Sequence, residues 1–202
     1  MTGLLKTAPT DIGFAQITLS AMNAVATSES PFTYKQQVVQ HTGQAWKASV
    51  TIPPVRRDLG EPWVAFLLSL QGPVNNFLLG DPNCAAPRGT AVNGDIVATG
   101  TAGASSVTLT LSNGGTLKAG DYIQLGSLAT SKLHKVLADI SATGVVDIWP
   151  NLKDTYSGAD PTSAVIVEGA KGVFRLTNNV QEWQIGNSST YGISFEAVEV
   201  IT

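Results

Sequence analysis

The chain has 202 residues and a formal net charge of -3 at pH 7, and only 13% of its residues are charged. A soluble domain of ordinary composition carries about 25% charged residues, so this surface must be built mainly from uncharged polar groups. Such a surface separates copies of a protein poorly, which favours an oligomer or a component of an assembly. The basic residues are scattered along the chain, which argues against binding to the phosphate backbone of a nucleic acid.

The sequence offers little catalytic chemistry. No apolar run is as long as a signal-peptide core or a membrane span, so we expect a soluble protein made in the cytoplasm, without membrane insertion. Cys84 is the only cysteine, which excludes an internal disulfide and a thiolate metal cluster. His41 and His134 have no Cys, Asp or Glu at metal-ligand spacing, and no nucleophile or nucleotide motif occurs. We therefore predict no enzyme activity, no catalytic residue, no metal and no cofactor.

The first fifty residues predict β-structure. The elements expected there are a strand over residues 14–19, a loop over residues 21–30, and a hairpin with strands over residues 33–40 and 45–52. Thr42-Gly43 suits the turn of this hairpin. Pro53 and Pro54 would end its second strand.

One amphipathic helix is predicted after the hairpin. Four large apolar residues follow the spacing i, i+3, i+4 and i+7, namely Trp63, Phe66, Leu67 and Leu70. This spacing puts them on one face of a helix that covers a sheet. Gly60 suits the N-cap, while Gly72 and Pro73 supply a stop. Asp58 and Glu61 favour the positive end of the helix dipole, which explains them better than acid catalysis.

Residues 90–170 differ from the rest because they are rich in small residues and poor in aromatic ones. Six short β-prone runs lie between turn signals, over residues 96–99, 106–111, 122–125, 133–140, 145–149 and 164–168. Short strands at this spacing are typical of a small barrel or sandwich.

Aromatic residues return in the last thirty positions, in alternating runs over residues 173–178, 181–185 and 193–200. We therefore predict a mainly β protein. Residues 1–85 and 172–202 would form a discontinuous β-sandwich with one helix, and residues 86–171 an inserted small β-barrel. The alternative, independent domains in series, would leave the last thirty residues as an unsupported three-stranded piece.

A few side chains are candidates for particular roles. Arg56, Arg57 and Arg88 suit ion pairs at a subunit boundary, although a solvated basic turn explains them equally well. Trp46, Trp63 and Trp183 are expected in the core with Phe66, Leu67 and Leu70, whereas exposure of Trp149 is left open. Glu196 and Glu199 would point to opposite faces of the last strand, which argues against a paired site.

Several segments resemble the distal tail proteins, a group of minor tail proteins of long-tailed bacteriophages. They are WKASVTIPP from Trp46, WVAFLLSLQG from Trp63, FLLGDP from Phe77, PRG from Pro87, LKAGDYIQL from Leu117, KV from Lys135 and IWPNL from Ile148. The similarity spans residues 31–200 and lies in structural motifs, with no catalytic residues to carry over.

The resemblance implies a belt-like β-sandwich with a helix, six copies of which close a ring. In some members a small barrel of the oligonucleotide/oligosaccharide-binding type (OB-fold) is added. It also implies contacts with the tail tube protein and with the tip or hub protein, and a lumen that holds the tape-measure protein and later the genome. The protein would then reside in the virion after assembly in the host cytoplasm.

Exposed edge strands can pair with a neighbouring copy, and one repeated contact closes a ring when its rotation is right. The hypothesis is that the hairpin over residues 33–52 and the strand over residues 193–200 form ring contacts, while the barrel projects outward. Two other classes stay open: a carbohydrate-binding module for host attachment, and a wall hydrolase, which needs two close carboxylates. Another tail tube or tip adaptor protein is a third alternative.

Overall fold

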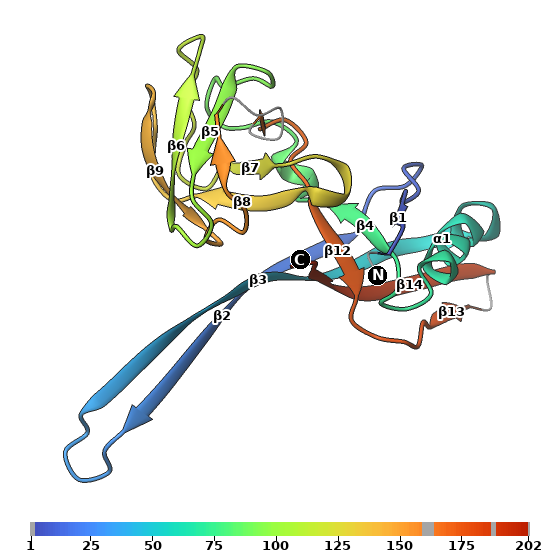
Figure 1. Ribbon diagram of the computed structural model, residues 1–202. Coiled ribbons are helices and arrows are strands. Elements are labelled where there is room, and N and C mark those ends of the chain that lie inside the picture. The colour runs from blue at the N-terminus through green and yellow to red at the C-terminus, as the bar shows by residue number, and fades with distance from the viewer. Residues whose placement is uncertain (1–2, 159–163, 187–188, 202) are drawn as a thin grey trace.

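The computed structural model describes residues 3–158, 164–186 and 189–201. Over this part of the chain the protein is mainly β, with one α-helix and two curled seven-stranded sheets (Figure 1). This is consistent with a β-sandwich plus a barrel-like part and confirms the predicted fold class.

The first sheet combines strands from both ends of the chain. Its strands are β1 (Leu5–Lys6), β2 (Gln16–Glu29), β3 (Gln36–Arg56), β4 (Asn76–Leu79), β12 (Gly172–Leu176), β13 (Trp183–Ile185) and β14 (Thr190–Glu199). Their order is β1-β4-β12-β14-β3-β2, with β13 also paired to β14. Strand β12 is antiparallel to both β4 and β14, so the chain returns to the same sheet after its middle segment.

The second sheet, which we call the barrel-like part together with its connecting loops, contains only strands from the middle of the chain. They are β5 (Ile96–Gly100), β6 (Ser106–Leu111), β7 (Tyr122–Leu125), β8 (Lys132–Val136), β9 (Gly144–Trp149), β10 (Tyr156–Ser157) and β11 (Val165–Ile166), in the order β10-β5-β6-β9-β8-β7-β11. A bridge between Val97 and Ala164 links β5 to the residue before β11, which curls the sheet toward closure. Two 3-10 turns, η1 (Pro82–Cys84) and η2 (Leu128–Thr130), complete the elements.

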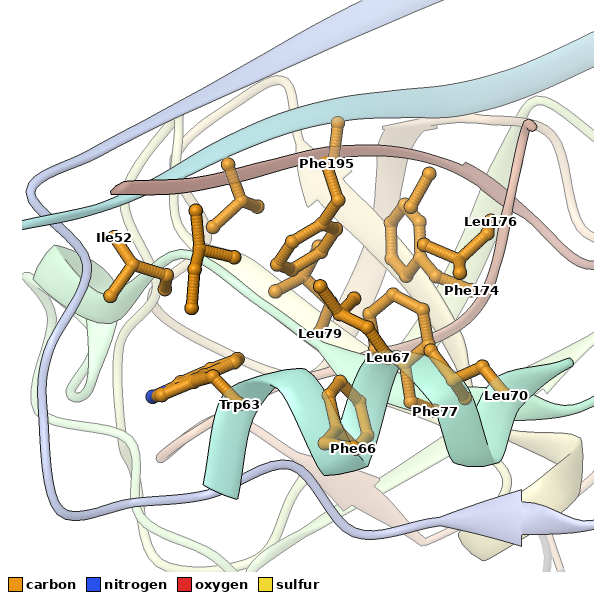
Figure 2. Close-up of a cluster of buried hydrophobic side chains, with 14 of the residues drawn as sticks. Ile52, Trp63, Phe66, Leu67, Leu70, Phe77, Leu79, Phe174, Leu176 and Phe195 are labelled. Carbon is orange, nitrogen blue, oxygen red and sulfur yellow. The ribbon is translucent and has the colours of Figure 1, made fainter. Parts of the chain in front are cut away.

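Helix α1 (Arg57–Leu70) covers the first sheet with its predicted apolar face. Figure 2 shows the side chains of this face directed at rings from β4, β12 and β14. Phe77 lies 5.6 Å from Phe66 and 5.9 Å from Phe195 between ring centroids, in edge-to-face arrangements. Such pairs add to the free energy gained by burying the rings, so the helix and the sheet share one core.

The predicted start of the helix is wrong, whereas its end is confirmed. The helix begins at Arg57 with Arg56 as N-cap, and Gly60 lies inside it. A Cβ atom at position 60 would come within 2.8 Å of Tyr191 Cβ, so this glycine permits close contact between helix and strand. Gln71 and Gly72 adopt left-handed backbone angles and stop the helix at the expected place.

The predicted hairpin over residues 33–52 is also wrong. Residues 36–56 form one continuous strand, β3, which pairs with β2, and residues 21–29 of the expected loop belong to β2. The chain reverses at residues 30–35, where Tyr34 has a φ of 54°. Thr42-Gly43 lies instead at a shift in register, where residues 41–43 face Ala24 alone. Turn-forming residues are used here for a bulge inside a strand.

Pro53 and Pro54 do not end the strand as predicted. Ile52 pairs with Ile193 and Val55 with Tyr191, so both prolines lie opposite Gly192 at a second bulge. A bulge tolerates proline because the ladder is interrupted there and no backbone N–H is needed.

The strands predicted in the middle of the chain agree with the structure to different degrees. Those over residues 96–99, 106–111, 122–125 and 145–149 are confirmed to within one residue. The strand expected over residues 133–140 ends at Val136, and the one expected over residues 164–168 is reduced to two residues.

Candidate assembly surface

The end of the β2–β3 hairpin extends beyond all the other strands of both sheets (Figure 1). We call residues 24–43 the arm; it lies beyond the cross-strand pair Asn23 and Gln44, which we call the root. At about 3.3 Å per residue, the six residues from Ala24 to Glu29 extend the arm by about 20 Å. Apart from Ser30, every residue of the arm is exposed.

The arm is a ribbon of two strands with unpaired edges. Strand β14 pairs with β3 only between Lys47 and Arg56, and no described strand pairs with the arm from either side. Strand β14 itself has β3 on one side and β12 and β13 on the other, so the free edge expected at residues 193–200 for ring contacts is wrong. The outward N–H and C=O groups of such an edge can pair with another chain. A two-stranded ribbon is at best marginally stable by itself in water, so a partner would stabilise the arm.

The arm carries few charges and many exposed apolar groups. Its charged residues are Glu29 and Lys35, and the Gln36 amide donates to the Glu29 carboxylate at 2.6 Å. At the tip, Phe32 is 91% and Tyr34 is 77% exposed. Large exposed apolar groups on a soluble protein mark sites of interaction when they gather in one place.

Apolar groups occur on both faces of the ribbon. Val38 faces Thr27 on one side of the ribbon, and Val39 faces Ala26 on the other. A strand that lies on its own core would have one apolar and one polar face. The arm therefore suits contact along its edges or from both sides, and its pattern does not match a ribbon that folds back onto its own domain.

A buried polar cluster joins the two sheets near the root of the arm. The Lys132 ammonium, in a residue that is only 2% exposed, donates to the Val200 carbonyl at 3.0 Å. The Glu199 carboxylate accepts from the Trp46 backbone N–H at 3.2 Å. Burial raises the pKa of the Glu199 carboxyl and lowers the pKa of the Lys153 ammonium, and their mutual attraction opposes both shifts.

His134 lies fully buried in the same region. Its Nδ1 is 2.8 Å from the Pro150 carbonyl oxygen, which can only accept, so Nδ1 carries the proton. Burial lowers the pKa of this imidazole to about 4, and it is neutral at pH 7. Because no ligand from solution can reach such a buried ring, we assign His134 a packing role where the two sheets meet.

Two cavities, of 390 and 310 Å³, adjoin β13 and share Glu182 and Ser194 in their walls. Trp183 and Gln184 line the smaller one. In the wall of the larger cavity, the Glu196 carboxylate forms an ion pair with the Lys47 ammonium at 2.9 Å. Glu199 is buried on the other side of β14, so the structure does not bring these two carboxylates together.

The three candidate arginines do not form one site. Arg57 pairs with Glu61 at 3.3 Å along α1, and Arg56 lies next to it in the wall of an open hollow. Arg88 lies 3.5 Å from the Asp121 carboxylate and donates to the Ala119 carbonyl, within the barrel-like part. The Arg57–Glu61 pair is exposed on both sides and contributes little to stability.

Five of the six residues expected in the core are buried, and the sixth is half-buried. Trp46, Trp63, Phe66, Leu67 and Leu70 are buried, and Trp183 is half-buried against the same cluster. Trp149 is half-buried too, with its ring centroid 4.4 Å from that of Trp46. Sequence reasoning missed the arm because residues 21–30 have small side chains, although they lack glycine and proline throughout and could therefore extend a strand.

No three described His, Cys, Asp or Glu side chains are grouped so as to hold a metal ion. None of the described helices is long and apolar enough to cross a membrane.

No protein-family model matches the chain, and no curated protein sequence matches it either. A proposal about function therefore depends on the geometry of the arm and on the motifs that resemble the distal tail proteins.

Proposed function

We propose that this protein is a structural, non-enzymatic subunit of a phage tail tip that assembles into a ring through its arm. The observation that carries the proposal is the arm itself, a neutral ribbon with two unpaired edges and exposed apolar groups. Such a ribbon needs a partner, and the sparsely charged surface of the chain does little to keep copies apart.

A ring requires a contact between two different surfaces of successive copies. When an arm from one copy binds the body of the next, the same contact repeats, and a fixed rotation closes it. A contact between two arms related by a twofold axis would instead stop at a dimer. The projection of the arm beyond its own sheets favours the first geometry.

The number of copies and the other partners come from the resemblance to distal tail proteins. It implies a hexamer in the virion, with the tail tube protein on one side and the tip or hub protein on the other. The tape-measure protein would occupy the lumen.

The proposal is tested by measuring the native mass of the purified protein and by imaging its rotational symmetry. Replacing residues 24–43 with Asn-Gly joins the root strands by a two-residue turn. This variant should fold and remain monomeric, because the arm contributes nothing to the core. A ring that still forms without the arm would overturn the proposal.

A point variant with a matched control sharpens the test. Val38→Ser removes an apolar group from the arm, where the side chain is 61% exposed, and should weaken assembly. Val145→Ser makes the same change on β9, where the side chain is 70% exposed, and should leave assembly unchanged. Equal effects of the two changes would contradict a role for the arm.

A carbohydrate-binding module is the second candidate. It is favoured by the cavity beside β13, where Trp183 lies with Gln184 and Glu182, since an aromatic ring and planar polar groups suit a sugar. Titration with soluble cell-wall oligosaccharides, followed by tryptophan fluorescence, tests this site. A response that Trp183→Ala abolishes would support the module, and its absence would reject it.

A further inference from the structure

The root of the arm is bound by the barrel-like part of the protein. The Trp149 indole N–H donates to the Asn23 side-chain oxygen at 2.9 Å. The Asn151 backbone N–H donates to the Gln44 side-chain oxygen at 2.7 Å, and the Lys153 ammonium donates to the Gln44 carbonyl at 2.7 Å. One short segment, residues 149–153, thus binds both strands of the hairpin at the same cross-strand pair.

The position of these bonds matters because the ladder is irregular directly beyond them. Residues 41–43 of β3 face only Ala24 of β2, and bulges of this kind bend a strand and increase its twist. No described strand supports the arm beyond this point. An unsupported ribbon could therefore swing about the bulge, and the root is the last place where another element holds it.

The hydrogen bonds at the root resist this motion because two of them are shielded from water and one has a charged donor. Gln44 is buried, and Lys153 is half-buried, so water competes poorly for their bonds. A charged donor makes a stronger hydrogen bond than a neutral one. The Trp149 ring also packs edge-on against Trp46, which belongs to the same strand as Gln44.

The barrel-like part is itself fixed to the first sheet. The Trp46 indole N–H donates to the Leu133 carbonyl at 2.9 Å, and Lys132 bonds to the Val200 carbonyl. The Val173 N–H donates to the Ser131 carbonyl at 3.1 Å, which ties β12 to the residue before β8. A support that is anchored in this way can transmit a fixed direction to the arm.

We infer that residues 149–153 form a brace that sets the direction of the arm. The inserted barrel-like part is then an orienting element for the arm, in addition to anything that it binds. A fixed direction is what a closing ring requires, because the rotation between neighbours decides whether the repeated contact closes. This last consequence rests on the proposed function, whereas the bracing does not.

The experiment measures the distance between arm and body within one molecule. Spin labels are placed at Ser28→Cys on the arm and at Ala65→Cys on the exposed side of α1, in a full-length chain with Cys84→Ser. The labelled chain and an excess of unlabelled chain both carry Val38→Ser, which weakens assembly, so that each distance comes from within one molecule whose arm is not held by a neighbour. We expect a single narrow distance distribution by pulsed electron paramagnetic resonance.

The variant Trp149→Phe with Lys153→Met removes two donors of the brace and keeps most of the packing volume. It should lose the single narrow distribution and give a broad one. The control, Lys118→Met, removes a lysine of the same barrel-like part that pairs with Asp139 at 2.9 Å. It should behave as the parent chain, and circular dichroism confirms that all three proteins are folded.

The brace is refuted if the double variant keeps the narrow distribution, or if the parent chain already shows a broad one. Should the double variant fail to fold, Trp149→Phe alone is measured against the same two criteria. The native mass of each unlabelled protein is recorded separately. A parent chain that is monomeric would contradict the ring proposal and leave the brace intact. A parent chain that forms rings but gives a broad distance distribution would support the ring proposal and contradict the brace.

Discussion

Stability should fall in mild acid because His134 is buried without charge. The folded protein holds this imidazole neutral, with its Nδ1–H on the Pro150 carbonyl and with a pKa lowered from 6.5 to about 4. An unfolded chain exposes the ring and binds a proton near pH 6.5. Protons therefore favour the unfolded state between these two values, and the stabilisation present above pH 6.5 is lost as the pH falls toward 4.

The size of the effect follows from the separation of the two pKa values. One unit corresponds to about 1.4 kcal/mol, so the full shift corresponds to about 3 kcal/mol of unfolding free energy. That is a large part of the total stability of an ordinary domain. Glu199 acts in the opposite direction, because burial raises the pKa of its carboxyl and protonation then favours the folded state.

The assay is urea unfolding at several values between pH 7.5 and 4.5, for the parent chain and for His134→Asn. The asparagine amide can take the place of Nδ1–H and cannot titrate, while Glu199 contributes alike to both proteins. The variant will be less stable near neutrality because the ring volume is lost. Its stability should nevertheless fall less with pH than that of the parent, and equal slopes would refute the assignment.

Two further predictions concern the core of the first sheet. Gly60→Ala should lower the unfolding free energy by about 1 kcal/mol, because the clash of the new methyl group with Tyr191 outweighs the better helix propensity of alanine. Phe77→Ala should cost about 3 to 5 kcal/mol, since this fully buried ring contacts two other rings. Both are measured by urea unfolding at pH 7.5, and a neutral outcome in either would contradict the packing described.

Much of the fold could be predicted because its signals are local. The spacing of Trp63, Phe66, Leu67 and Leu70 specifies an apolar helix face wherever the helix packs. Short β-prone runs between glycine-containing turns mark the strands of the barrel-like part in the same way. The stop at Gly72 is local as well, because left-handed backbone angles favour glycine regardless of surroundings.

The candidate assembly surface was harder to predict because it depends on which segments pair. Thr42-Gly43 has the composition of a turn, yet it forms a bulge because β2 is long enough to pair with β3 beyond it. The apolar residues of the arm lie on both of its faces, so the arm lacks the one-sided pattern by which a strand is recognised in a sequence. Its length is set by the register of two strands, and register is a property of the pair.

By itself, the sequence determined that this protein is mainly β, that a single amphipathic helix covers one sheet, and that the surface is sparsely charged. Periodicity and composition are properties of each segment alone. Only the tertiary structure decided that Gly60 serves contact with Tyr191, and that Glu199 is buried beside Lys153 although it lies on a terminal strand. It alone decided that Gln44 is held by a segment more than a hundred residues away, because such contacts exist only after distant parts of the chain have packed together.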